Sequence, residues 1–131
     1  MSHYVIDTHA LVWYLADDPR LGGVARRIIE KEGKLLIFPT IVLAEIHYLH
    51  RKRPALASLE EALHAIDEDP RGLIYPLEIG VVRSLPADLN IHDAIITATA
   101  LVIQKALGKE VSVITKDEEI IRSKIVSTIW E

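Results

Sequence analysis

The sequence contains no cysteine, few aromatic residues and no excess of positive charge. Without cysteine, a disulfide framework and a thiolate zinc site are both excluded, and the absence of thiols fits the reducing cytoplasm where we expect this protein. The 15 Lys and Arg against 19 Asp and Glu give a net charge of −4, which argues against binding nucleic acid by bulk charge alone. Any nucleic acid would have to be engaged locally, through metal ions.

Long hydrophobic runs are also missing. The longest apolar stretch without a charge covers residues 94–104, about half of the ~20 residues that a membrane span needs. The N-terminus has no basic region and Asp7 interrupts its apolar run, so we expect neither a membrane span nor a signal peptide. A chain of 131 residues, 50% of them hydrophobic, can bury one core, and we expect one domain over residues 1–131.

Short apolar segments alternate with longer amphipathic ones along the whole chain. The apolar segments predict strands at residues 3–6, 35–38, 73–75, 111–114 and 126–130. Helices are predicted at residues 10–16, 21–31, 40–51 with Thr40 as cap, 56–67, 78–83, 91–107 and briefly after Asp117. This alternation indicates a three-layer α/β/α fold with a central parallel sheet of about four to five strands.

One acidic residue stands where the helical pattern expects a hydrophobic one. Residues three and four apart share a helix face, which places Glu45 on an apolar stripe with Ile41, Val42, Tyr48 and Leu49. A buried carboxylate is costly unless it is paired or binds a metal ion. The alternative is a buried ion pair or a hydrogen-bonded glutamate without a functional role.

Three further acids lie where strands give way to helices. Asp7 and Asp117 each follow a predicted strand, and in open parallel sheets ligands bind beyond the carboxyl ends of strands. Both could instead be helix N-caps, for which Asp is favoured. Asp93 opens the apolar helix at residues 91–107, where the alternative is a first-turn acid that follows Asn90 as N-cap.

Together these four acids predict one carboxylate cluster. With no Cys and no HExxH motif, such a cluster favours Mg²⁺ or Mn²⁺ over zinc. A carboxylate-held Mg²⁺ binds phosphate oxygens and makes a nucleophilic water more acidic, so phosphoryl chemistry that depends on the metal is expected. A non-catalytic α/β binding module stays open. A receiver-like module would carry paired acids after its first strand, whereas Asp7 stands alone.

Four segments that carry these acids match the motifs of a known family in order and spacing. They are VIDTHALVW at residues 5–13, PTIVLAEI at 39–46, IHDAIITATA at 91–100 and VITKD at 113–117. Over essentially its whole length the chain resembles the PIN-domain family, and within it the VapC-type toxin ribonucleases of type II toxin–antitoxin systems.

The resemblance implies a metal-dependent endoribonuclease. Asp7, Glu45, Asp93 and Asp117 would hold one or two Mg²⁺ ions, for which Mn²⁺ would substitute. The metal would orient a water for in-line attack on an RNA phosphodiester, leaving 5′-phosphate and 3′-hydroxyl ends.

Several other polar residues have both a functional and a structural interpretation. The hydroxyls of Thr8 and Thr115 could contact metal-bound water or phosphate, or simply complete strand ends and caps. Arg51, Lys52 and Arg53 follow the helix of the second motif and could bind RNA phosphates. They could equally be a solvated helix C-terminus, where the dipole favours cations.

The resemblance also implies partners: an RNA substrate, a second copy of the chain in a homodimer, and a small antitoxin protein that enters the acidic groove. Apolar helices at residues 10–16 and 56–66 are candidates for the dimer surface. Two alternatives within the family are a nuclease acting on DNA and a PIN domain that has lost activity. An inactive domain would lack one of the acids, whereas all four are present.

Overall fold

The protein is described here by a computed structural model, which covers residues 3–131. Its strands are β1 (His3–Ile6), β2 (Leu35–Pro39), β3 (Gly72–Tyr75), β4 (Ser112–Ile114) and β5 (Ser127–Ile129). They form one five-stranded sheet in the order β3-β2-β1-β4-β5, and every neighbouring pair is parallel. The predicted parallel sheet of four to five strands is confirmed.

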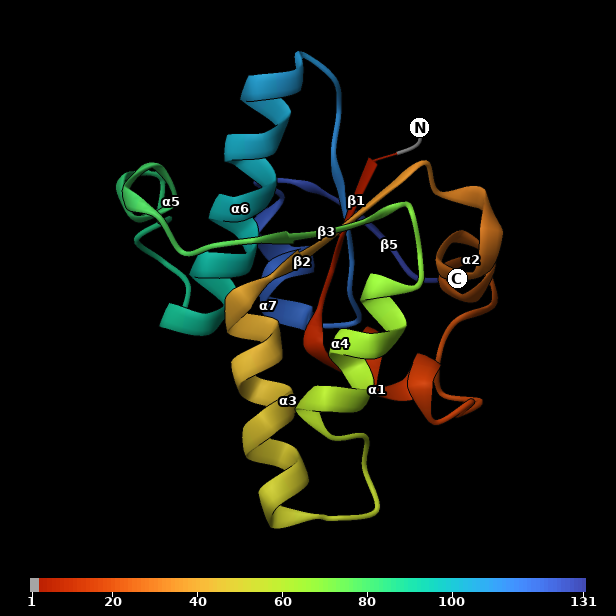
Figure 1. Cartoon of the computed structure of the whole chain (residues 1–131). Helices are drawn as coiled ribbons and strands as arrows, with labels where there is room; N and C mark the ends of the chain where they lie inside the picture. Colours follow the sequence, from red (N-terminus) through yellow and green to blue (C-terminus); the bar gives the residue numbers. More distant parts are fainter. Residues whose placement is uncertain (1–2) are drawn as a thin grey trace.

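Helices cover both faces of this sheet (Figure 1). They are α1 (Thr8–Leu15), α2 (Gly23–Arg27), the π-helical η1 (Ile28–Glu32), α3 (Thr40–Lys52), α4 (Leu59–Asp67), α5 (Ile79–Arg83), α6 (Ile91–Leu107) and α7 (Glu118–Ser123). In Figure 1, α5 and α6 lie to one side of the sheet and α2 and α4 to the other. The three-layer α/β/α prediction is therefore also confirmed.

The core lies on both sides of the three central strands. Val5, Ile37 and Val113 are fully buried, as expected where a parallel sheet is covered on both faces. The helices predicted as a dimer surface contribute to this same core, since Leu11 of α1 and Ile66 of α4 are buried in it. These residues pack within the chain, and the prediction that the two helices cover a second subunit stays a prediction.

The sheet has one topological switch point. β1 lies at the centre with β2 on one side and β4 on the other, so the connections that leave β1 and β4 diverge at their carboxyl ends. Open α/β sheets bind ligands in the crevice that forms at such a point.

Within residues 3–131, no helix combines the length and hydrophobicity that a membrane crossing requires.

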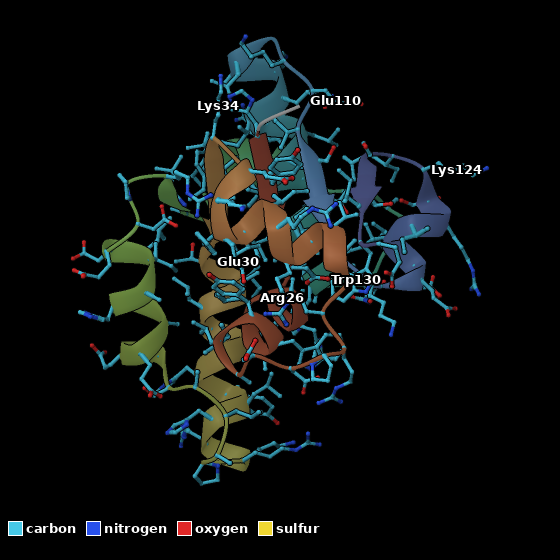
Figure 2. All side chains as sticks on the ribbon, turned by 90° about the vertical axis from the view of Figure 1, so that its right-hand side faces the viewer. Arg26, Glu30, Lys34, Glu110, Lys124 and Trp130 are labelled. Atoms are coloured by element: carbon cyan, nitrogen blue, oxygen red, sulfur yellow. The ribbon has the colours of Figure 1, made fainter. Side chains whose placement is uncertain are left out.

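The predicted helix at residues 21–31 is wrong in its start and in its regularity. Gly22 passes so close to the last residues that a Cβ there would lie 2.2 Å from the Trp130 carbonyl oxygen. The Ala25 amide donates to the same oxygen at 3.0 Å, and Trp130 lies against the start of α2 in Figure 2. The helix therefore begins at Gly23 and, from Ile28 onward, continues as the π-helix η1.

Two other helix starts also differ from the prediction. Thr40 is not a cap, because its hydroxyl donates to the Tyr75 carbonyl at 3.0 Å and so links α3 to β3. α4 begins three residues later than predicted because Ser58 and Glu61 form a capping box, with bonds of 2.8 and 3.1 Å. A capping box satisfies two backbone donors reciprocally and so determines where a helix starts.

Candidate functional site

All four predicted acids line one pocket of about 870 Å³ at the carboxyl ends of the central strands. Asp7 follows β1, Asp117 follows β4, Glu45 comes from α3 and Asp93 from the first turn of α6. The pocket thus lies at the switch point of the sheet, where side chains from four separate elements converge. Its remaining walls combine aliphatic and aromatic side chains, two histidines and Lys116.

Asp7 is held by two hydrogen bonds. One oxygen accepts from the Thr8 amide at 2.6 Å, so the predicted N-cap role is real. The other accepts from the hydroxyl of Thr115, which is itself buried. Burial raises the pKa of Asp7 to about 6, and the charges of Glu45 and Asp117 add to the rise, while the two hydrogen bonds oppose it. The carboxylate therefore lies in a site that disfavours its own negative charge.

Asp117 caps α7 and lines the pocket at the same time. Its Oδ1 accepts from the amides of Glu119 and Ile120 at 2.9 and 3.1 Å. Its own amide donates to the Thr115 hydroxyl at 3.0 Å, so Thr115 bridges Asp7 and Asp117. Capping and function are compatible here, because the capping bonds go to one carboxylate oxygen only.

Asp93 is buried at the mouth of α6. Asn90 is the N-cap, as predicted, and accepts from the Asp93 amide at 3.0 Å. The Asn90 side-chain amide also donates to Asp93 Oδ2 at 2.7 Å. Burial, followed by the charges of Asp117 and Glu45, raises the pKa of Asp93. Burial is thus the main cause of both raised pKa values, and the charges of Glu45 and Asp117 add to each.

Glu45 does not face the core, so that part of the prediction is wrong. The buried residues of α3 are Val42, Leu43 and Ile46, whereas Tyr48 is 58% exposed. Glu45 lies beside this buried stripe and points into the pocket, where Thr8 donates to Oε1 at 2.5 Å and His92 Nδ1 lies 3.0 Å from Oε2. Apolar periodicity alone cannot separate a face that meets the core from one that borders a pocket.

The charge of these acids is not balanced by fixed cations. Within residues 3–131, no lysine or arginine forms a salt bridge with any of the four acids. Glu45 lies within ion-pair distance of His92. No three acidic or histidine side chains of this described part are placed to hold a metal ion as they stand. The donor set itself is all carboxylate oxygen, the chemistry that Mg²⁺ and Mn²⁺ prefer.

The structure divides the remaining predicted residues into two groups. Thr8 and Thr115 are buried and hydrogen-bond to the carboxylates of Glu45 and Asp7. Arg51, Lys52 and Arg53 are exposed at the end of α3, and none of the three lines the pocket.

Sequence reasoning missed the aromatic and basic part of the pocket. Trp13 and Lys116 line the pocket, and so does Tyr48, which the helical pattern placed on the apolar stripe of Glu45. Two signals were present in the sequence: Tyr48 is three residues after Glu45 on one helix, and Lys116 directly precedes Asp117.

A model of the PIN domain family matches residues 4–125 of this chain. The chain belongs to the PIN domain family. No curated protein matches it. The matched segment contains all four pocket acids, so the pocket is a feature of this PIN domain and not of an added segment.

Two solved structures share the fold of this PIN domain. A chain of the VapBC2 complex of Rickettsia felis, solved bound to a DNA fragment from its promoter, superposes with a TM-score of 0.67 at 15% identity, covering 98% of each chain. VapC20 of Mycobacterium tuberculosis, a toxin that cleaves the sarcin–ricin loop, gives a TM-score of 0.64 at 16% identity, covering 98% of this chain and 99% of VapC20. At these identities the likeness shows the fold.

Proposed function

We propose that this PIN domain is a metal-dependent endoribonuclease that acts in the cytoplasm as the toxin of a toxin–antitoxin pair. One observation carries the proposal: four carboxylates from four elements line one pocket at the switch point of the sheet, and no lysine or arginine of residues 3–131 forms a salt bridge with them. Membership of the PIN family and the fold shared with VapC20 support it.

Asp7, Glu45, Asp93 and Asp117 would hold Mg²⁺, with Mn²⁺ as a substitute. When bound, the ion supplies Lewis acidity, a more acidic water and charge stabilisation on the leaving oxygen. The protein's own contribution is to hold the four carboxylates ready. Hydrogen bonds orient each of them, and such outer partners determine ligand geometry.

The raised pKa values fit this role. Asp7 and Asp93 lie where burial and neighbouring carboxylates disfavour a negative charge. A cation among these side chains would relieve that repulsion. Some carboxylate oxygens would then coordinate the cation and give up the hydrogen bonds that they accept now. Clustered carboxylates also repel an RNA phosphate, so cleavage is expected to depend on the metal.

The direct test is cleavage of total cellular RNA by purified protein with Mg²⁺, with Mn²⁺ and with EDTA. We expect discrete fragments that require the metal. In Glu45→Gln the rate should fall by more than about 100-fold, because loss of even an outer partner of a metal ligand costs about 10–100-fold. Glu60→Gln, an exposed charge on α4, is the matched control. Equal cleavage by wild type and Glu45→Gln, or cleavage in EDTA, would contradict the proposal.

Variants of Thr115 distinguish a role in positioning the acids from a role in folding. Its hydroxyl donates to Asp7 and accepts from the Asp117 amide, so Thr115→Val should lower kcat for RNA cleavage by about 10–100-fold with a smaller change in KM. Thr115→Ser keeps the hydroxyl and should recover most of kcat. If Ser and Val variants lose kcat equally while both remain folded in thermal melts, the hydroxyl does not position the acids.

We also propose a homodimer and a small antitoxin as partners of this chain. The VapBC2 structure contains a chain of the same fold within a VapBC complex. The exposed apolar surface that a second copy would cover includes Leu77, Ile79 and Val82 around α5, which are 46–63% exposed. Light scattering should give twice the chain mass of 14.7 kDa, and Ile79→Lys should reduce it to one chain mass. A monomeric wild type would contradict the dimer.

A further inference from the structure

Two aromatic rings of the pocket wall carry cations on their faces. Lys52 Nζ lies 4.8 Å from the centre of the Tyr48 ring. Over Trp13, Arg20 Cζ lies at 4.8 Å and Lys116 Nζ at 5.8 Å. Each of these contacts is a cation–π pair of an exposed cation, which is weak at such sites, and the cation can exchange the ring for a phosphate oxygen.

One ring, Tyr48, and one cation, Lys116, lie close to an acid of the pocket along the chain. Tyr48 follows Glu45 by three residues on α3, so both side chains lie on the same part of the helix surface. Lys116 directly precedes Asp117, and both line the pocket. The two rings differ in accessibility. Trp13 is half-buried with the Trp130 ring edge-on at 5.8 Å, whereas Tyr48 is 58% exposed.

We propose that Tyr48 is the platform on which a base of single-stranded RNA stacks, and that Lys52 and Lys116 bind the flanking phosphates. The inference rests on the proposed function and names the form of its substrate. On binding, the two ammonium groups leave the rings of Tyr48 and Trp13 and contact phosphate oxygens. A duplex cannot use this platform, because its bases are already stacked and paired.

The cations favour RNA over an apolar peptide as the occupant of this wall. An apolar peptide would gain from the exposed Tyr48 ring but would leave Lys52 and Lys116 without a charged partner. A polyanion with flat bases uses both features at once, since every base has a face that stacks on an aromatic ring. RNA is therefore the occupant that matches both the ring and its cations.

The test measures binding without cleavage. In an Asp7→Asn background, fluorescence anisotropy gives the Kd for a short, mixed-sequence, fluorescein-labelled RNA, single-stranded and annealed to its complement. We expect tighter binding of the single strand. Tyr48→Leu should raise that Kd about tenfold, within the roughly 1–3 kcal/mol of one base–aromatic stack, whereas Tyr48→Phe should retain it.

The two lysines are tested by salt dependence. Lys52→Gln and Lys116→Gln should each raise the Kd and reduce the slope of log Kd against log salt by about 0.7, the value for one phosphate contact on a single strand. Lys105→Gln is the charge-matched control, because Lys105 is exposed in the last turn of α6, away from the pocket. Its Kd and slope should equal those of the parent.

Two outcomes would overturn the inference. If Tyr48→Leu binds RNA as the parent does, the exposed ring serves another partner, such as a protein. If Lys105→Gln weakens binding as much as Lys52→Gln, binding depends on bulk charge. Failure of the proposed function is distinguishable, because RNA cleavage would be missing from the wild type while the effects of Tyr48 and the lysines on binding would persist.

Discussion

Asp7→Asn is expected to abolish metal-dependent RNA cleavage and, in the absence of metal, to stabilise the folded protein at neutral pH. The loss of cleavage should exceed about 100-fold, for the reason given for Glu45. The gain in stability follows from the raised pKa of Asp7, about 6 against an ordinary value of 3.8. Such a rise means that folding disfavours the ionised carboxylate by up to about 3 kcal/mol.

The sign of the pH dependence follows from proton binding. Between the two pKa values the folded state binds more protons than the unfolded state, so stability decreases as the pH rises. The destabilisation by Asp7 is fully present above about pH 6 and disappears as the pH falls toward 3.8. Asn carries no charge, and its amide oxygen can accept from the Thr8 amide while its NH2 group donates to the Thr115 oxygen, the reverse of the present bond.

Urea unfolding of both proteins in EDTA at several pH values measures this difference. We expect Asp7→Asn to be the more stable near pH 7 and the two proteins to converge near pH 4. Added Mn²⁺ should stabilise the wild type and have less effect on the variant, because a ligand that binds only the folded state raises its stability. A variant that is less stable than wild type at pH 7 without metal would contradict the burial of a charged Asp7.

Arg71→Met is expected to produce the largest loss of stability, about 3 kcal/mol. The Arg71 guanidinium makes a two-pronged contact with Asp69, with bonds of 2.7 and 2.9 Å. It also donates to backbone carbonyls of η1, including those of Ile28 and Ile29, and to the carbonyl of Gly33 that follows it. Methionine fills similar space but removes all of these side-chain bonds. The Ile28 carbonyl then keeps only the Gly33 amide and Asp69 only the amide of residue 71, and the loss of partners by groups that are largely buried costs about 1–3 kcal/mol for each.

The Arg71 contact also has an electrostatic signature. The hydrogen bonds from Arg71 lower the pKa of Asp69 below its ordinary 3.8. The stability that this pair contributes is therefore present above that pH and is lost as the pH falls below it, the opposite sign to Asp7. In Arg71→Met this acid-dependent contribution should be missing.

Equilibrium urea unfolding at pH 7 measures the effect of Arg71. Arg122→Met is the matched control, because Arg122 pairs with Glu118 on the exposed face of α7 with both side chains at least 70% exposed. Exposed pairs of this kind contribute about 0.3–0.5 kcal/mol. If Arg71→Met costs no more than Arg122→Met, the carbonyls of η1 have found other partners, and Arg71 does not hold the end of this helix.

Local sequence determined the layers of the fold and the positions of the acids. Alternating short apolar runs and amphipathic segments predicted the parallel sheet, and strand ends placed Asp7 and Asp117 at one edge of it. The capping roles of Asp7, Asn90 and Asp117 were also readable, because a cap acts on amides one to three residues away. These features depend on residues that are close in the chain, so the sequence alone is enough to predict them.

Only the tertiary structure decided which contacts surround the acids. Thr115 reaches Asp7 across 108 residues, and Arg71 reaches the Ile28 carbonyl across 43. Glu45 and Tyr48 line the pocket, and Tyr48 is also 58% exposed, because the sheet and the neighbouring helices cover only part of the face of α3 that periodicity marks as apolar. Periodicity shows which side chains share a face. Packing between distant segments decides whether that face meets core, pocket or water.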